Sequence, residues 1–160
     1  RQRQMCIRDS NNIMSARLNI ATVDSAAYKA MMGLESYLQT ISLSHIQKEL
    51  IKIRASQINK CAFCLDMHTK DALKYGETTQ RIFILEGWRE AKDFFTEDEQ
   101  VLLAMTEEIT LISHEGLTEE TYQKAKQVFD EAQIAQIIIA IVTINAWNRI
   151  AVSTHLPIAK

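Results

Sequence analysis

The chain has 160 residues, 47% of them hydrophobic, and a formal net charge of -2 at pH 7, which suits one compact domain with its own core. The near-neutral charge provides no broad basic surface, so we expect neither nucleic acid nor an anionic membrane as a partner. We find no apolar run of about 18 residues and no secretory signal, and therefore expect a soluble cytoplasmic protein.

The first thirteen residues do not share the pattern of the rest. Residues 1–10, RQRQMCIRDS, are basic, lack helical periodicity and look like the translation of a transposase adapter used in sequencing libraries. On this interpretation the native chain begins at Met14 and Cys6 is not native, whereas the alternative is an ordinary disordered tail. We exclude residues 1–13 as a non-native extension and expect residues 14–160 to form a single helical domain.

Helical periodicity begins at Asp24, whose side chain can cap a helix that extends to about residue 38. Ser44 and Gln47 are spaced as a capping box for a second helix, which includes Glu49. A third helix begins at residue 60 or 61 and ends near residue 75, because Gly76 suits a left-handed C-terminal cap. The apolar stripe of the first helix comprises Ala27, Met31, Leu34 and Leu38.

Four more helices are expected, over about residues 79–88, 96–113, 118–129 and from 130 into the C-terminal region. The last contains IAQIIIAIVTINAWNRIAV, which is apolar on most of its circumference, so it is either the central helix or is covered by another subunit. One proline, four glycines and no hairpin dipeptides give a sheet little support. We therefore predict an all-α bundle of about six to seven helices that forms a homo-oligomer.

The reactive side chains are concentrated between Glu49 and His68, where Cys61, Cys64 and His68 have the spacing C-x-x-C-x-x-x-H. Residues three, four and seven apart share one helix face, so the two sulfurs and the imidazole would point into one small volume. The helix N-terminus and a nearby imidazole both favour a thiolate. A thiolate attacks a peroxide to leave a sulfenic acid, which a second thiol converts to a disulfide, so an external dithiol reductant is implied.

Glu49 followed after eleven residues by CAFCLDMH resembles the alkylhydroperoxidase D-like (AhpD-like) branch of the carboxymuconolactone decarboxylase superfamily. The resemblance extends from about residue 24 to 152 and includes KIRASQIN, DMHTKDA, GWRE and INAWNR. It implies an all-helical AhpD-like bundle, assembled as a trimer or hexamer. It also implies a thiol-dependent alkyl hydroperoxidase, with peroxiredoxin activity, or a disulfide reductase, without cofactor or metal.

The same resemblance implies a role for each residue. Cys64 would be the peroxidatic cysteine, Cys61 its proton donor and resolving partner, His68 the base, and Glu49 the carboxylate that orients and charges His68. The best-studied hydroperoxidases have a histidine directly before the second cysteine, where this chain has Phe63, so one proton-handling group is missing. The expected partners are a small hydroperoxide and a dithiol or thioredoxin-like reductant.

Other interpretations of these residues stay open. The cysteines could pack as small hydrophobes, or bind a metal with His68 and a fourth ligand, although no second C-x-x-C is present. A decarboxylase acting on a small lactone acid and a non-enzymatic, redox-buffering oligomer are the alternative functions. The candidate fourth metal ligands are His45, His114 and His155.

Two further groups of residues have structural interpretations. We expect Trp88 and Trp147 to be core or subunit-interface aromatics rather than substrate clamps. On the last helix, Asn145, Asn148 and Arg149 are expected to form interhelical hydrogen bonds rather than to line the site.

Overall fold

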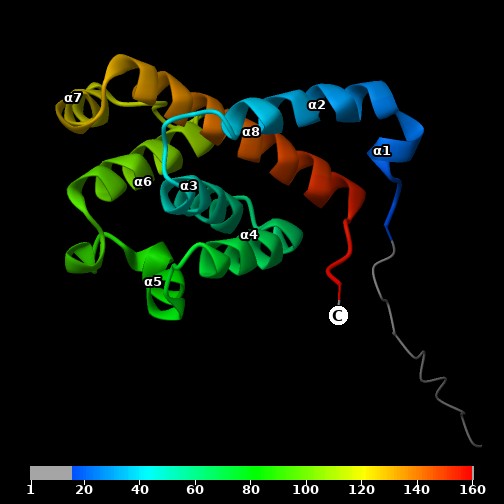
Figure 1. Ribbon diagram of the computed structural model, residues 1–160, viewed down its shortest axis with the longest axis horizontal. Coiled ribbons are helices and arrows are strands. Elements are labelled where there is room, and N and C mark those ends of the chain that lie inside the picture. Colours follow the sequence, from blue (N-terminus) through cyan, green and yellow to red (C-terminus); the bar gives the residue numbers. More distant parts are fainter. Residues whose placement is uncertain (1–15, 160) are drawn as a thin grey trace, which may run out of the picture.

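The computed structural model describes residues 16–159, so the interpretation of residues 1–13, Cys6 and Met14 lies outside the described residues. The described chain is all-helical and has no strand (Figure 1). Its elements are α1 (Ile20–Val23), α2 (Ser25–Leu38), α3 (His45–Ile58), α4 (Ala62–Lys74), α5 (Thr79–Ile84), the 3-10 helices η1 (Leu85–Gly87) and η2 (Lys92–Phe94), α6 (Glu97–Thr110), α7 (Glu119–Val128) and α8 (Glu131–Thr154).

The all-α prediction is confirmed, but residues 16–159 contain eight α-helices rather than six to seven. The additional helix is α1, four residues long and capped by the Asn19 side chain, which accepts from Ala21 N at 2.9 Å. Four residues are too few to produce the apolar periodicity from which helices are predicted. Two boundaries also differ: α6 ends at Thr110, before residue 113, and the expected helix 79–88 divides into α5 and η1.

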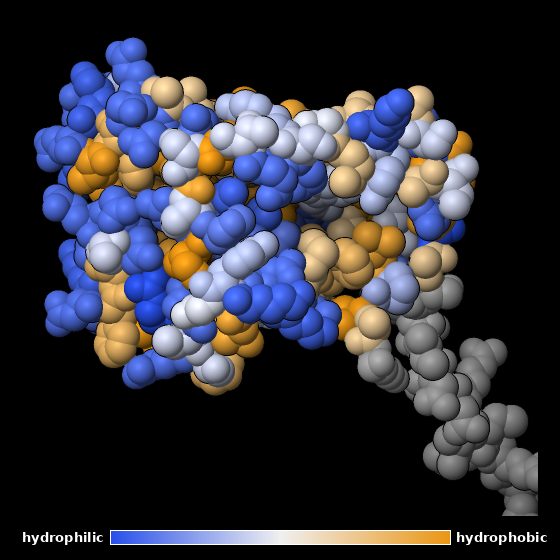
Figure 2. Space-filling model, in the orientation of Figure 1, coloured by the Kyte–Doolittle hydropathy of each residue, from blue (hydrophilic) through white to orange (hydrophobic). Residues whose placement is uncertain are grey.

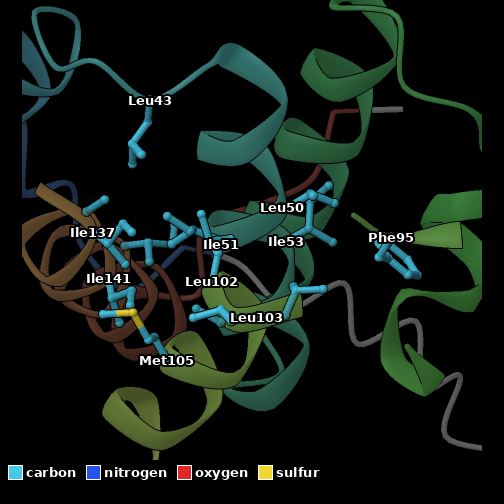
Figure 3. Close-up of a cluster of buried hydrophobic side chains, with 14 of the residues drawn as sticks. Leu43, Leu50, Ile51, Ile53, Phe95, Leu102, Leu103, Met105, Ile137 and Ile141 are labelled. Carbon is cyan, nitrogen blue, oxygen red and sulfur yellow. The ribbon is translucent and has the colours of Figure 1, made fainter. Parts of the chain in front are cut away.

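The core is built around α3, which packs against α4, α6 and α8. Its apolar side chains meet those of α6 and α8 in one buried cluster (Figure 3). The capping box of Ser44 and Gln47 is present at the start of α3. Fully buried members of the cluster are Leu50, Ile51, Ile53, Leu102, Leu103, Met105, Ile137 and Ile141. The site residues on α3 therefore stand on a helix that three neighbours hold in place.

Of the two alternatives for the long helix α8, the structure supports a helix that packs into the core of its own chain. Ile137, Ile141 and Ile144 are buried within the chain itself, and Ile138 is half-buried, so these isoleucines give no support to an oligomer. The expectation that no segment could span a bilayer is corrected, because α8 is long and apolar enough by composition. Half of its most apolar stretch is buried in the bundle, which accounts for that composition.

Helix α2 extends along α8 and beyond it, together with α1 (Figure 1). Of its predicted apolar stripe only Leu38 is buried; Met31 and Leu34 are half-buried and Ala27 is exposed. The stripe is covered mainly toward its C-terminal end, although near its N-terminal end Tyr28 contacts Trp147 of α8, with the ring centroids 5.7 Å apart. The described chain thus covers the N-terminal half of α2 only in part.

Candidate active site

The two cysteines stand at the turn from α3 into α4. Lys60 adopts a left-handed backbone with φ 55°, which makes a tight turn possible, and Cys61 N donates to Ser56 O at 3.0 Å. Cys61 is the N-cap of α4, where its Sγ accepts from Cys64 N at 3.3 Å. Cys64 therefore lies in the first turn of α4, where the helix dipole favours a negative charge.

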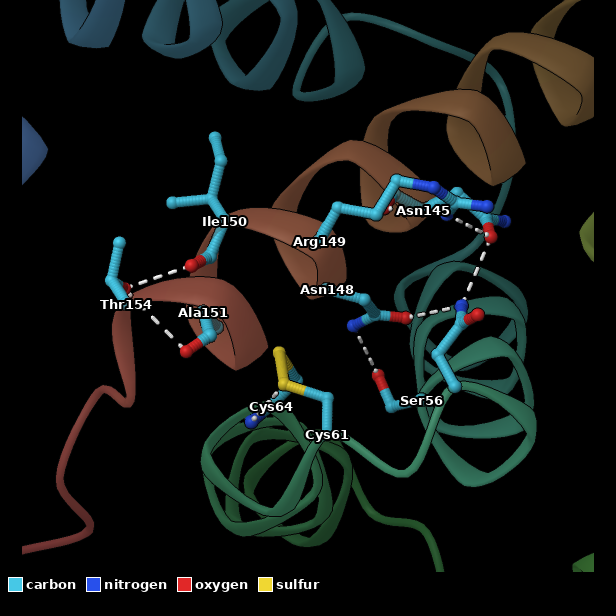
Figure 4. Close-up of a disulfide and its surroundings, with 10 residues drawn as sticks. Ser56, Cys61, Cys64, Asn145, Asn148, Arg149, Ile150, Ala151 and Thr154 are labelled. Carbon is cyan, nitrogen blue, oxygen red and sulfur yellow. Dashed lines mark hydrogen bonds between the residues drawn. A yellow bond between two sulfur atoms is a disulfide. The ribbon is translucent and has the colours of Figure 1, made fainter. Parts of the chain in front are cut away.

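The structure joins Cys61 and Cys64 in a disulfide with a Cα–Cα distance of 5.3 Å (Figure 4). Both sulfurs are buried, packed against Ala151 of α8 and bordered by the half-buried Phe63 and Leu156. The pair therefore lies between the start of α4 and the last turn of α8. Any partner that reduces this disulfide must approach past these side chains.

His68 lies one turn after Cys64 on α4, and Glu49 faces it from α3. The Nδ1 atom of His68 is 2.9 Å from Glu49 Oε2, and both side chains are buried. Held this way, the imidazole has Nδ1–H toward the carboxylate and Nε2 available to accept a proton. The structure therefore brings together the four residues selected from the sequence: a cysteine pair, a histidine and the carboxylate that orients it.

A further charged residue, Lys52, belongs to this group and was not predicted. Its Nζ donates to Glu49 Oε1 at 3.1 Å, so the two carboxylate oxygens are shared between Lys52 and His68. Burial by itself raises the pKa of Glu49, but the hydrogen bond from His68 and the charge of Lys52 outweigh it and leave the pKa below its ordinary value. A lysine three residues after a glutamate on a helix is a sequence signal that could have identified this pair.

The lowered pKa has a direct consequence for stability. A carboxylate whose pKa is lower in the folded than in the unfolded chain stabilises the fold above its unfolded pKa, and this contribution is lost as the pH falls through the folded pKa. Because its pKa lies below the ordinary carboxyl value, Glu49 is ionised throughout the neutral range, so His68 is hydrogen-bonded to a charged carboxylate there.

The site opens into a cavity of about 420 Å³ between α2, α3, α4 and α8. Cys64 lines this cavity, whereas Cys61 does not. Apolar side chains gather in the recessed region below α2 and beside α4 in Figure 2. Apolar lining residues are Tyr28, Met32, Phe63, Met67, Trp147 and Leu156, and polar ones include His45, Lys48, Glu49, Lys52 and His68.

The two tryptophans have different surroundings. Trp88 is buried and donates from Nε1 to Glu107 Oε1 at 2.9 Å, as expected for a core aromatic. Trp147 lines the site cavity and donates from Nε1 to Glu35 Oε1 at 2.8 Å. Trp147 also packs against the core, as expected, so it is a core aromatic that forms part of the cavity wall.

Asn145 and Asn148 of α8 form interhelical hydrogen bonds, as predicted, but Arg149 does not, because it bonds only to Asn145 within α8. Asn148 is fully buried, accepts from Asn59 Nδ2 at 2.9 Å and donates to Ser56 Oγ at 3.0 Å (Figure 4). Asn145 also accepts from Asn59, and Arg149 donates to Asn145 Oδ1 at 2.9 Å. These contacts attach α8 to α3 next to the disulfide.

Asn148→Ala should therefore lower the melting temperature. The substitution leaves the buried Ser56 hydroxyl and Asn59 amide each without one partner, at a cost of about 2 kcal/mol, or roughly 4–8 °C in a protein of this size. Thermal unfolding followed by circular dichroism measures the shift, with the exposed Ser153→Ala on the same helix as the matched control. Equal melting temperatures for the two variants would contradict a structural role for Asn148.

Among residues 16–159 no three His, Cys, Asp or Glu side chains are grouped to hold a metal ion. The three candidate fourth ligands lie on different elements. His45 begins α3, His114 lies in the turn after α6, and His155 is the C-cap of α8 with φ 53°.

Residues 25–107, just over half of the chain, match the model of the carboxymuconolactone decarboxylase family. The uncharacterized protein YdfG of Bacillus subtilis (strain 168) is 42% identical over 140 residues, which are 88% of this chain and 95% of that protein. The chain belongs to the carboxymuconolactone decarboxylase family. The resemblance proposed from the Glu49 and CAFCLDMH residues is confirmed.

Solved structures agree with the AhpD-like fold. A protein of unknown function from Agrobacterium tumefaciens, described as a candidate antioxidant defence protein AhpD, superposes with a TM-score of 0.88 at 38% identity, over 91% of this chain and 99% of that one. A peroxidase-related protein from Silicibacter has a TM-score of 0.71 at 24% identity over 81% and 68% of the chains. The debrominase Bmp8 has a TM-score of 0.72 at 18% identity over 82% and 70%. At these lower identities the likeness concerns the fold alone.

Proposed function

We propose that this protein is a thiol-dependent peroxidase of the AhpD type, which reduces a small hydroperoxide at Cys64 and is regenerated by a dithiol. The proposal rests on one arrangement of side chains. The disulfide-bonded cysteines at the N-terminus of α4 lie near the buried Glu49–His68 pair, and Cys64 and His68 line the same cavity. The likeness to the Agrobacterium protein, described as a candidate AhpD, supports the same reading.

In the reduced protein, His68 accepts the Cys64 thiol proton and Glu49 stabilises the resulting imidazolium. The thiolate attacks the terminal oxygen of the hydroperoxide, so that the S–O bond forms as the O–O bond breaks. The leaving alkoxide takes the proton from His68 and departs as an alcohol. Cys64 is now a sulfenic acid, oxidised by two electrons, while the hydroperoxide has been reduced by two.

The second half of the cycle restores the thiols. Cys61, the N-cap of α4, condenses with the sulfenic acid to form the disulfide and releases water. An external dithiol then reduces the disulfide by thiol exchange and becomes a disulfide itself. The burial of both sulfurs makes a small dithiol, or the exposed end of a dithiol arm on a thioredoxin-like protein, the reductant that fits best.

The alternatives are less well supported by this site. Decarboxylation of a lactone acid makes no use of a redox-active cysteine pair, and a redox buffer needs neither the cavity nor the relay. A disulfide reductase would use the same thiol–disulfide exchange at Cys61 and Cys64, and it differs only in that no hydroperoxide is reduced. It is therefore the nearest alternative.

Consumption of a hydroperoxide tests the proposal directly. We expect the fully reduced protein to consume cumene hydroperoxide with turnover in the presence of dihydrolipoamide, dithiothreitol or thioredoxin with its reductase, and to stop after about one equivalent without them. Reduction of a model disulfide without loss of hydroperoxide would replace the peroxidase by a disulfide reductase. Activity with neither substrate would contradict both.

We also propose a homo-oligomer, trimeric or hexameric, because α2 carries the exposed Tyr28, Met32 and Tyr37, of which the first two line the site cavity. Exposed apolar side chains that lie together, as Tyr28 and Met32 do one turn apart, are typical of an interaction surface. Light scattering at micromolar concentration should give a mass several times 18.3 kDa. A monomer mass would exclude this assembly.

A further inference from the structure

A lysine without a counter-ion lies in the wall of the site cavity. Lys48, on α3, lines the cavity and is only 6% exposed. Its ammonium donates one hydrogen bond, to Leu38 O at 3.3 Å, and forms no ion pair with a carboxylate of residues 16–159. An ammonium has three N–H donors, so two of them have no acceptor among residues 16–159.

The carboxylates around the same cavity already have partners. Glu49 is bound to His68 and Lys52, Glu35 accepts from Trp147, and Asp71 is paired with Lys74 at 2.7 Å. None of these three supplies Lys48 with a charged hydrogen bond. Among residues 16–159, Lys48 therefore has N–H donors left for a ligand in the cavity, although the Glu35 carboxylate in the same lining also has no cation bonded to it.

Leaving an ammonium buried in this way is unfavourable, since burial penalises a charge unless it is paired. Burial, followed by the neighbouring Lys52 ammonium, lowers the pKa of Lys48, and the Glu49 carboxylate only partly offsets this. An anion entering the cavity would bind both free N–H groups of Lys48. It would also remove the cost of its burial.

We propose that Lys48 binds an anionic group of the substrate, so that the preferred hydroperoxides have an apolar body and a carboxylate. This inference rests on the proposed function for the identity of the reacting group. The other lining residues fit such a molecule: Phe63, Met67 and Trp147 provide apolar walls, and Cys64 lies at the same cavity for the hydroperoxide end. A volume of about 420 Å³ is in the range that encloses a small organic ligand.

Binding without chemistry is the first test. 4-Isopropylbenzoate has the proposed shape and charge and contains no peroxide, and 4-isopropylbenzyl alcohol is its uncharged counterpart. By calorimetry we expect the wild-type protein to bind the carboxylate about tenfold or more tightly than the alcohol, as befits a charge-assisted hydrogen bond. Lys48→Met should abolish this preference, and Lys48→Arg should retain part of it.

The control is Lys70→Met, which removes an exposed lysine of α4 that is paired with Asp66 and does not line the cavity. It should bind both probes as the wild-type protein does. Lys48→Met should not lower the melting temperature, because it replaces an unpaired buried charge with an apolar chain of similar length. Equal affinity of the wild-type protein for the two probes would overturn the inference whatever the variants do.

Kinetics separate this inference from the proposed function. With a dithiol present, 4-(2-hydroperoxypropan-2-yl)benzoic acid should have a kcat/KM at least about tenfold above that of cumene hydroperoxide, and Lys48→Met should remove the difference through KM. Turnover of both peroxides at equal kcat/KM would support the proposed peroxidase activity and overturn the substrate-binding role of Lys48. Selective binding of the benzoate without any peroxide turnover would support the anion site and overturn the peroxidase.

Discussion

Without an added dithiol, Cys64→Ser should reduce hydroperoxide consumption to the background rate, whereas Cys61→Ser should consume one equivalent and then stop. Cys64 is the cysteine that lines the cavity, and a serine hydroxyl cannot replace the thiolate that attacks the peroxide. Without Cys61 the first oxidation still occurs, but no thiol condenses with the sulfenic acid. Dimedone labelling followed by mass spectrometry of the tryptic peptides should locate that sulfenic acid at Cys64.

The chain has a third cysteine, Cys6, which supplies the matched control. Cys6→Ser should turn over hydroperoxide at the wild-type rate, and the two site variants are best compared in that background so that Cys6 cannot act as an alternative resolving thiol. Sulfenic acid at Cys61 in an active Cys64→Ser protein would reverse the two roles. A double variant that still consumes hydroperoxide would remove the pair from the chemistry altogether.

Local features of the chain were predictable from the sequence because their causes are local. The Ser44 capping box depends on neighbouring residues, and Gly76 has the expected left-handed backbone after α4, with φ 94°. The start of α4 at the cysteines follows in the same way from the chain near it. Short-range hydrogen bonds and steric limits decide such positions, so a sequence pattern is sufficient.

The site required more than local pattern. Glu49 and His68 are 19 residues apart and on different helices, and spacing alone does not bring two helices face to face; the family resemblance supplied that pairing. Lys48 and Trp147 were not recognised as cavity residues, because the cavity exists only once α2, α3, α4 and α8 are packed. The partial exposure of α2 was also not predictable, since apolar periodicity gives the face of a helix but not what covers it.

In the proposed relay, the Glu49 carboxylate is shared between two partners. Glu49 binds His68 through one oxygen and Lys52 through the other, so its charge is fixed in place before any proton moves. This arrangement keeps Nε2 of His68 as the proton-accepting atom while Nδ1 is held by Glu49. Loss of the imidazole should therefore lower the thiolate fraction of Cys64 directly, whereas loss of the carboxylate charge should lower it indirectly, by destabilising the His68 imidazolium.

His68→Ala should slow alkylation of reduced Cys64 by iodoacetamide at pH 7 by about tenfold, because the thiol returns toward the ordinary cysteine pKa of about 8.5 and fewer molecules carry the thiolate. Glu49→Gln should act in the same direction with about a threefold effect, since it removes the charge that stabilises the imidazolium but leaves the base. Labelling rates measured from pH 5 to 10 give the midpoint for each variant.

The matched control for this series is His114→Ala, which removes a histidine in the exposed turn after α6 and should leave the labelling profile unchanged. Near-ultraviolet circular dichroism confirms that each variant is folded before labelling. If His68→Ala has the wild-type labelling profile over the whole pH range, His68 does not activate Cys64 and the cysteine pair has a structural role. If Glu49→Gln slows labelling more than His68→Ala does, Glu49 acts on the thiol by a route other than His68, and the order of the relay is wrong.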